Sequence, residues 1–413
     1  MKLIETINNS LKDNFRFRAV LLLCSVAFIA LREPALLLYP RLWAEEGVIF
    51  YAFALHHSVW DAFTTAHVGY LTLFNSMISV LQAKVFSVEN VAVVSAYMGF
   101  LIQLIPVYII IFTTHTFWNN PLKKIICVFI IIVVAAPELW LNTTNSHFIF
   151  GLITFLIMII SAAQLSGIQK HLFRVLLFIG GLTGPASIFL SPVFSLKAYR
   201  ARSREKYIQA GIISICAIIQ AMIILYAILY NNTYHRLSNY NFRHTMFAFF
   251  GDNFSMFPHD YGSYANLTIF YICLFSGILM SFSYIYLFIK NRKNNEYLIA
   301  LLSFILVAVF STLGSLDMAG SPRYAYIPTC ILLMVFVSEA FDGKLNRKKY
   351  TYIVTAILMA SLVIHLYYYK SSMKYISSTN FPKWKNEVAK WRADTTYRPI
   401  VHPGTDDGQR IKL

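Results

Sequence analysis

Long apolar runs recur from one end of the chain to the other, with short polar segments between them. The runs fall roughly at 17–38, 70–86, 91–112, 124–137, 148–166, 172–196, 208–230, 265–289, 296–315, 324–341 and 350–369. A helix needs about 20 apolar residues to cross a bilayer, where only helices and closed barrels can pair their own backbone groups. The pattern therefore predicts an all-α polytopic membrane protein with about 9–11 transmembrane helices.

Two features of these runs predict irregular membrane segments. The run 172–196 contains "GLTGPAS", and its Gly184–Pro185 step should end a helix. We expect two half-length helices that meet at an outward-facing turn, because irregular backbone at membrane depth is tolerated only where it lines a protein cavity. The count of crossings also requires one run between 70 and 112 to dip into the membrane and return without spanning.

Composition agrees with a membrane protein. Of the 413 residues, 57% are hydrophobic and only 13% are charged, whereas soluble domains carry about 25% charged residues. The formal net charge of +16 gathers in short loops, as the positive-inside rule requires, so a nucleic-acid partner is not expected. All five cysteines lie inside apolar runs without paired spacing, which favours buried thiols over disulfides or a metal site.

The basic loops predict the orientation of the chain. Short basic segments at 197–206, 290–296 and 342–349 should face the cytoplasm. The basic N-terminus should also be cytoplasmic, ahead of an uncleaved first helix, since no small-residue cleavage site follows. We expect one membrane bundle over 1–369 and a periplasmic tail over 370–413. The outer loops of the bundle are then 39–69, 137–148, 231–264 and 316–323.

Two adjacent carboxylates, Glu45 and Glu46, lie in "RLWAEEGVIF" directly after the first span, with Trp43 before them. Solvated loop acids, or acids aligned with a helix dipole, would explain them without function. However, the loop holds only one other acid, Asp61. A carboxylate beside apolar walls at the membrane surface can become basic enough to accept a proton. We therefore interpret the pair as a candidate catalytic site.

Arg323 in "GSPRYAY" lies at the outer mouth of the span 324–341. A snorkelling arginine, or a local pair with Asp317, is an equally good interpretation. Functionally, a guanidinium at headgroup depth is suited to hold a lipid phosphate.

Aromatic and polar side chains accompany these charges in the outer segments. Trp140, Asn145 and His147 lie in "WLNTTNSHF", where they could bind sugar hydroxyls or simply cap a helix. The tail contains "FPKWKNEVAKWRAD", which predicts an amphipathic helix with Trp384 and Trp391 on one face. This helix could lie in the headgroup plane or cover a groove.

No segment is suited to bind a nucleotide. The cytoplasmic loops are too short to form such a domain, and the chain has no glycine-rich phosphate loop. Group transfer on the outer face would need a donor that is available there, and a lipid-phosphate sugar meets that requirement.

Several motifs in order along the chain resemble one family. They are "RLWAEEGVIFYAFA", "HVGYLTLFN", "NTTNSHF", "GLTGPASIFLSP", "SPRYAYIP" and the tail "WKNEVAKWR". Together they resemble the integral-membrane, serotype-converting O-antigen glucosyltransferases of enterobacteria and temperate phages, within the GT-C superfamily. Family members often have "WAEDG" where this chain has "WAEEG". The resemblance therefore favours Glu46 as the base, with Glu45 as its helper.

The resemblance implies an inner-membrane enzyme that takes glucose from polyprenyl-phosphate-glucose. The acceptor would be a lipid-linked O-antigen on the periplasmic face, and a separate synthase and flippase would supply the donor. It adds His67 and Tyr324 to the expected substrate-binding residues. A divalent metal is allowed but not required. The alternatives are a transporter or flippase of lipid-linked sugars, an O-antigen polymerase and an acyltransferase.

Overall fold

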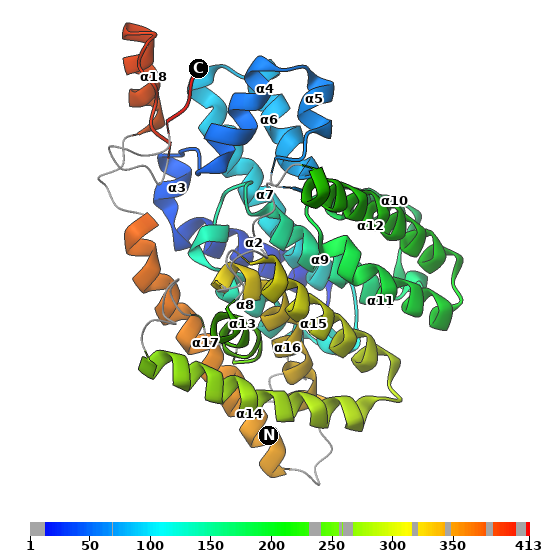
Figure 1. The fold of residues 1–413 in the computed structure, drawn as a ribbon. Helices are drawn as coiled ribbons and strands as arrows, with labels where there is room; N and C mark the ends of the chain where they lie inside the picture. Colours follow the sequence, from blue (N-terminus) through cyan, green and yellow to red (C-terminus); the bar gives the residue numbers. More distant parts are fainter. Residues whose placement is uncertain are drawn as a thin grey trace.

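A computed structural model describes the chain over residues 13–67, 69–230, 241–255, 258, 267–315, 321–342, 348–376, 383–401 and 410–413. Over these ranges the chain is helical, and strand-like pairing is limited to two isolated bridges. The predicted all-α membrane architecture is confirmed (Figure 1).

Six helices in the described ranges are long and apolar enough to cross a membrane. They are α7 (Val91–Phe112), α12 (Arg204–Tyr230), α14 (Leu267–Asn291), α15 (Asn295–Gly314), α16 (Pro322–Asp342) and α17 (Lys348–Ile376). Their bounds agree with the predicted spans to within a few residues at most ends. At the C-terminal end of α17 the difference is larger, because this helix continues past the expected end of the bundle at residue 369.

The other predicted spans are shorter or divided helices. They are α2 (Phe15–Arg32) with α3 (Pro34–Leu38), α6 (Leu73–Val85), α8 (Pro121–Val134), α9 (Ser146–Ile159), α10 (Gly167–Gly181) and α11 (Ala186–Ala201). Proline accounts for two of the boundaries: Pro34 and Pro121 each stand in the first turn of a new helix, where the missing N–H costs nothing. With 13 residues, α6 is too short to cross a bilayer, but α8 and α9 have only 14 residues each, so length alone does not identify the expected dipping segment.

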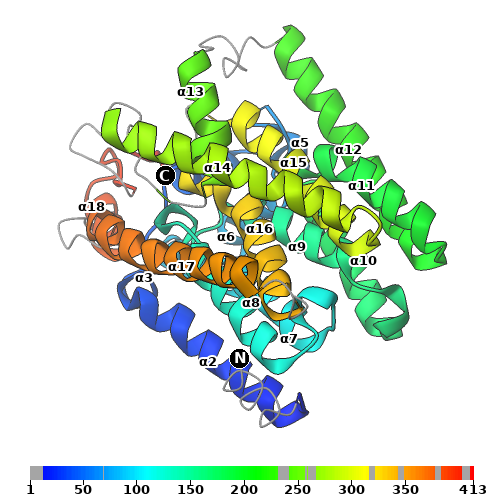
Figure 2. The same ribbon diagram turned by 90° about the horizontal axis from the view of Figure 1, so that it is seen from below.

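The helix α16 forms the centre of the bundle. It packs against α8, α9, α15 and α17, and it lies between these helices in Figure 2. By contrast, α12, α14 and α17 expose large apolar side chains, among them Ile215, Phe275 and Tyr367. A soluble protein rarely exposes such continuous apolar faces, so these helices are suited to contact lipid.

The predicted break at Gly184–Pro185 is present between α10 and α11. Thr183 pairs with Thr72 in an isolated bridge, and the Gly184 N–H donates to the Leu71 carbonyl at 2.9 Å. The Gln220 side chain, from α12, accepts from the Leu71 N–H at 2.9 Å and donates to the Gly184 carbonyl at 3.2 Å. The irregular backbone is therefore satisfied by another loop and by one buried amide.

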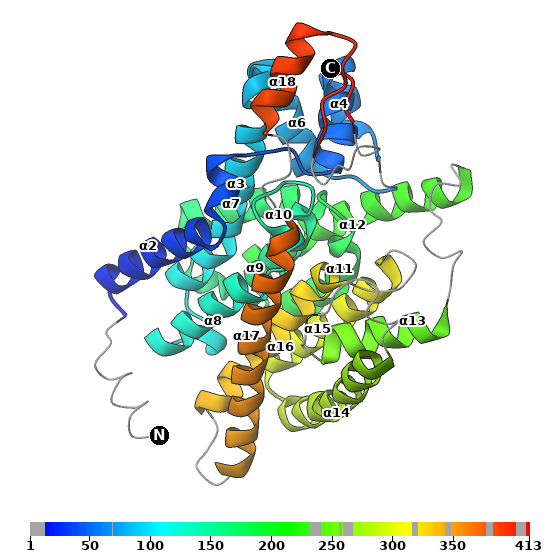
Figure 3. The ribbon, with the colours of Figure 1, turned by 90° about the vertical axis from the view of Figure 1, so that its left-hand side faces the viewer.

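The outer segment 39–69 is itself largely helical. It contains the π-helix η1 (Glu46–Tyr51), α4 (Ala52–His56) and α5 (Val59–Thr64). Figures 1 and 3 show α4, α5 and α6 gathered with α18 (Trp384–Ala393) and the C-terminus at one end of the molecule.

The tail packs on this end of the protein. Trp384 and Val401 are buried in a cluster with Leu42, Tyr51 and Val91. The Trp384 indole N–H donates to the Val88 carbonyl at 2.8 Å. The described tail is therefore docked on the protein through Trp384.

Two of the predicted outer loops lie partly outside the described residues. The loop 231–264 is described only over 241–255 and at 258, and the loop 316–323 only from 321. Asp317 therefore cannot be placed.

Of the five cysteines, four are buried as expected, while Cys24 is exposed on α2.

Candidate functional site

The turn before η1 fixes the two carboxylates in different environments. Ala44 has a positive φ of 39°, which is unusual for a residue with a side chain. The Trp43 backbone N–H donates to Glu46 Oε2 at 2.8 Å, and the Glu46 N–H donates back to the Trp43 carbonyl at 2.7 Å. This reciprocal pair resembles a capping box, and it directs Glu46 inward.

Glu46 is buried, with 2% of its surface exposed. Its Oε1 accepts from the Thr143 hydroxyl at 2.7 Å and also from the Thr143 backbone N–H. Burial raises the pKa of Glu46, although hydrogen bonds from Ser95, Thr143 and Trp43 act in the opposite direction. Both carboxylate oxygens are thus occupied, and Glu46 joins the segment after the first span to the loop before α9.

That second loop is also strained and closely packed. Leu141 has a positive φ of 51°. The described chain has three non-glycine residues with positive φ, and two of them, Ala44 and Leu141, lie two residues before Glu46 and Thr143. A Cβ on Gly99 of α7 would lie 2.6 Å from the Asn142 backbone nitrogen, which shows how closely the loop approaches this helix. Such strain persists only where the surroundings enforce it, and it concentrates at functional sites.

Glu45 has a different environment. It is partly exposed, and within the described ranges its carboxylate makes no hydrogen bond or ion pair. It does interact electrostatically with Arg323, at the start of α16. Arg323 Nε in turn lies 3.3 Å from Glu138 Oε2, in an ion pair whose two side chains are both partly exposed. Glu45, Arg323 and Glu138 therefore form a charged group with access to solvent.

The predicted aromatic and polar residues divide into two groups. Tyr324 is buried beside this charged group, with its ring 5.3 Å from Arg323 Cζ. Asn145 is buried and donates to the Glu138 backbone carbonyl at 2.7 Å, so it shapes the loop. Trp43 is partly exposed next to the carboxylates. These three residues belong to the site.

His147 connects the site to the helix break. Its ring lies 4.0 Å from that of Phe148 and 6.1 Å from that of Tyr70. A Cβ on Gly184, whose φ is +90°, would lie 2.7 Å from the His147 Cβ. The break between α10 and α11 therefore supports His147, as expected if irregular backbone marks a site.

Trp140 and His67 have mainly packing contacts. Trp140 is 3% exposed, and its ring lies 4.5 Å from Arg32 Cζ, which also lies 3.2 Å from the centre of the Tyr369 ring. This arrangement leaves Trp140 no open face for stacking. His67 packs edge-on against Phe50 and Phe53, and burial lowers its pKa, with a smaller contribution from His57.

The geometry suits a reaction in which a proton is accepted and negative charge is stabilised. Glu45 supplies an accessible carboxylate, and Arg323 supplies a cation at the end of a buried helix. Glu46 and Thr143 hold the two loops together beneath them.

No known protein family, curated protein or solved structure matches this chain.

The described ranges contain no group of three or more His, Cys, Asp or Glu side chains arranged to hold a metal ion. Glu138 and Thr143 are site residues that sequence reasoning missed, although both lie in the predicted outer loop 137–148. Their partners, Arg323 and Glu46, are far away in the sequence, so only the fold reveals the contacts.

Proposed function

We propose that this chain is an inner-membrane glycosyltransferase of the GT-C type. It would transfer glucose from polyprenyl-phosphate-glucose to a sugar of a lipid-linked O-antigen on the periplasmic face, and so convert serotype. The observation that carries the proposal is the partly exposed carboxylate of Glu45, which interacts electrostatically with Arg323 at one end of a bundle of apolar helices. The identity of the sugar and of the acceptor rests on the resemblance of the sequence motifs.

The proposed step is a single displacement. Glu45 accepts the proton of an acceptor hydroxyl, whose oxygen forms a bond to the anomeric carbon on the face opposite the phosphate. The bond from that carbon to the phosphate oxygen breaks, and polyprenyl phosphate leaves with the electron pair. Arg323 stabilises the departing anion, and a phosphate leaving group needs no general acid.

Glu46 takes a positioning role in this proposal. Its buried carboxylate is already bonded to Thr143 and to the Trp43 N–H, so an acceptor hydroxyl would have to displace one of these donors. Glu45 has no such competitor within the described ranges. This favours Glu45 as the base, although the family motif places Glu46 at the position of the usual aspartate.

The experiment is to express the chain with a polyprenyl-phosphate-glucose synthase and a flippase in a strain with a defined O-antigen, and to weigh the repeat unit. A hexose increment is expected with the wild-type chain and is lost with Glu45→Gln. Asp61→Asn is the matched control, since it neutralises another acid of the same outer segment and should keep the increment. An unmodified repeat across several O-antigens would refute the proposal.

The same strains test the transporter alternative. A flippase would deliver its lipid-linked sugar without adding a hexose when no other transferase is present. In the described part of the candidate spans, His365 is a buried titratable group of the kind that transporters use, but its Nδ1 lies 2.9 Å from the Ser361 carbonyl of its own helix. This local bond gives the transporter no specific support.

A further inference from the structure

A cavity lies at the other end of α9 from the carboxylate site. Its volume is about 480 Å³, within the range of roughly 300–1,000 Å³ that is typical of ligand sites. It is lined by the segment after α9, by the ends of α10, α11 and α12 that face this segment, and by Glu296 of α15. Since α9 has 14 residues at about 1.5 Å each, the two sites are roughly 20 Å apart.

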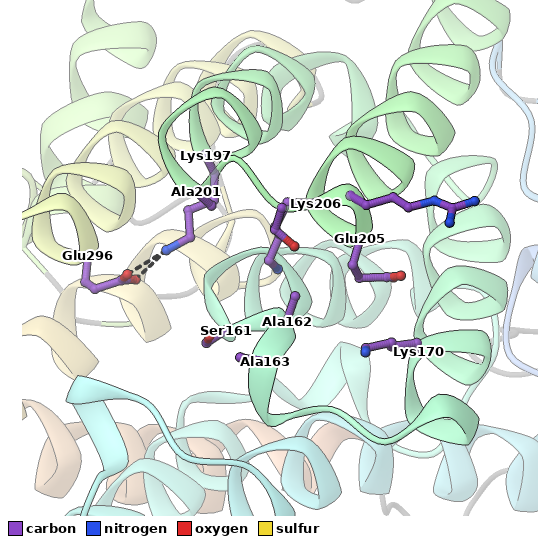
Figure 4. Close-up of a pocket in the computed structure, with 11 residues that line it drawn as sticks. Ser161, Ala162, Ala163, Lys170, Lys197, Ala201, Glu205, Lys206 and Glu296 are labelled. Carbon is purple, nitrogen blue, oxygen red and sulfur yellow. Dashed lines mark hydrogen bonds and ion pairs between the residues drawn. The ribbon is translucent and has the colours of Figure 1, made fainter.

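The cavity is strongly basic. Lys170, Lys197, Arg204 and Lys206 line it, against only two acids, Glu205 and Glu296. Figure 4 shows Lys170, Lys197 and Lys206 around the space, with Lys197 joined to Glu296. These cations come from α10, α11 and α12, so the fold assembles them from different helices.

Both acids already have cationic partners. Glu296 accepts from Lys197 at 2.6 Å and lies 3.0 Å from His115 Nε2. Glu205 forms a two-point ion pair with Arg174, which does not line the cavity. In the described ranges the lining acids therefore form no direct ion pair with Lys170, Arg204 or Lys206.

Lys206 is buried without a carboxylate partner in the described ranges. Its ammonium donates to the Ile157 and Met158 carbonyls at 3.0 and 2.9 Å, and to the Gln209 side chain at 2.8 Å. These contacts satisfy its hydrogens, and the acids Glu205 and Glu296 act on its charge only at longer range. In the described ranges the side chains of Lys170 and Arg204 make no hydrogen bond or ion pair, so no partner has to be displaced when they bind an anion.

Helix α10 also has an exposed apolar face. Ile168 is 83% exposed, and Leu172 and Val175 are exposed on the same face of the helix. At about 100° per residue this face lies on the opposite side of α10 from Lys170, which lines the cavity, so α10 meets the cavity on one side and is suited to contact lipid on the other. Basic pockets between membrane helices on the cytoplasmic side are suited to anionic lipid headgroups.

We infer that this cavity binds the phosphate headgroup of an anionic phospholipid. The inference does not depend on the proposed transfer reaction, because the cavity and the carboxylate site are separate. A free phosphate shares the relevant chemistry, and the test distinguishes the two sources.

The test uses the purified full-length protein in phosphatidylcholine nanodiscs, with thermal unfolding and native mass spectrometry as readouts. Adding phosphatidylglycerol should raise the melting temperature and give retained lipid. The double variant Lys170→Gln/Arg204→Gln should weaken this binding about tenfold or more. Each basic residue near an anionic headgroup strengthens binding several-fold, and the variant removes two of them. The control is Arg292→Gln/Lys293→Gln, which removes two exposed charges from the neighbouring basic loop without touching the cavity.

The outcomes separate the possibilities. Loss of phosphatidylglycerol binding in the cavity variant alone supports the inference. Equal stabilisation by inorganic phosphate, lost in the same variant, would keep the anion site but overturn its assignment to a lipid. Equal binding by the cavity variant and the control, or no preference for phosphatidylglycerol over phosphatidylcholine, would overturn the site itself.

Discussion

At the scale of single residues, two neighbouring glutamates of the same chemistry have different surroundings. Glu46 is buried and forms hydrogen bonds within its own loop and to Thr143, whereas Glu45 is partly exposed and interacts electrostatically with Arg323. A buried carboxylate with several donors is costly to alter, while an accessible one is free to take part in proton transfer. The two residues should therefore respond differently to the same substitution.

Glu45→Gln should lower transfer activity by about 100-fold or more at unchanged stability, because it removes a proton acceptor that has no structural partner. Glu46→Gln should instead destabilise the protein by about 1–3 kcal/mol, since one amide N–H₂ would face donors that now contact a carboxylate. Thermal unfolding and repeat-unit mass, measured on the same preparations, test both. Normal activity of Glu45→Gln beside an inactive but stable Glu46→Gln would make Glu46 the base.

Arg323→Ala should reduce turnover by about 2–4 kcal/mol of transition-state stabilisation, or tens- to hundreds-fold in rate. Arg323→Lys should recover only part of this, because a point charge does not replace a planar fork. Glu138→Gln should be measured beside these two variants, because it removes the charged partner of Arg323 and keeps the guanidinium. If all three variants turn over like the wild type, Arg323 is only an anchor at the membrane surface.

The residue types at this site could be predicted from the sequence, but their partners could not. The acids, Arg323 and the segment 137–148 all stand out as polar groups beside apolar runs. The pairing of Glu46 with Thr143, and of Arg323 with Glu138, depends on which loops meet at one end of the bundle. A hydrophobic pattern specifies each helix and leaves this arrangement open.

At the scale of elements, close backbone contacts hold the site. The loop before α9 approaches α7 at Gly99 so closely that no side chain fits between them. The break between α10 and α11 was predictable, because Gly184–Pro185 is a local signal. The docking of the tail was not, because an amphipathic helix fits a lipid surface and a protein groove equally well.

Gly99→Ala should destabilise the protein by about 1–3 kcal/mol and displace the Asn142 backbone from α7. Activity should fall together with stability, because Thr143, which donates a hydrogen bond to Glu46, directly follows Asn142 in the chain. The matched control is Gly211→Ala in α12, where an added Cβ would meet nothing within 4 Å. That control should be neutral or slightly stabilising. Equal melting temperatures for the two variants would contradict the close packing.

The docked tail should also depend on pH. Burial alone would raise the pKa of Glu387, but hydrogen bonds from Lys390, Tyr397 and the Ile400 N–H outweigh it and hold the pKa below its usual value. Because these three partners lie within the tail itself, the depressed carboxyl pKa stabilises the folded tail above the unfolded value of about 4.5, and this contribution is lost as the pH falls through the folded value. Proteolysis of the tail should therefore accelerate at acid pH in the wild type. Glu387→Gln should be cleaved readily even at pH 7, and a wild-type tail that is equally protected throughout would rule the mechanism out.

At the scale of the whole molecule, the carboxylate site and the basic cavity lie at opposite ends of the helix α9. The carboxylate site lies where α9 and α16 begin, and the basic cavity lies where α9 ends and α15 begins. The docked tail shares the end of the molecule that carries Glu45 and Glu46. The positive-inside rule predicts that the basic end faces the cytoplasm and that the carboxylates and the tail lie outside.

This assignment predicts the result of reporter fusions. An enzyme that is active only in the periplasm, joined through a flexible linker after Leu413, should be active, and a reporter that works only in the cytoplasm should be silent there. The same two reporters inserted after Lys293, in the basic loop between α14 and α15, should give the opposite pattern. The paired design matters, because a single inactive fusion can reflect poor folding, whereas a reciprocal pattern cannot. Cytoplasmic signal after Leu413 with periplasmic signal after Lys293 would invert the protein, and with it would place Glu45 on the side where no flipped lipid-linked donor is present.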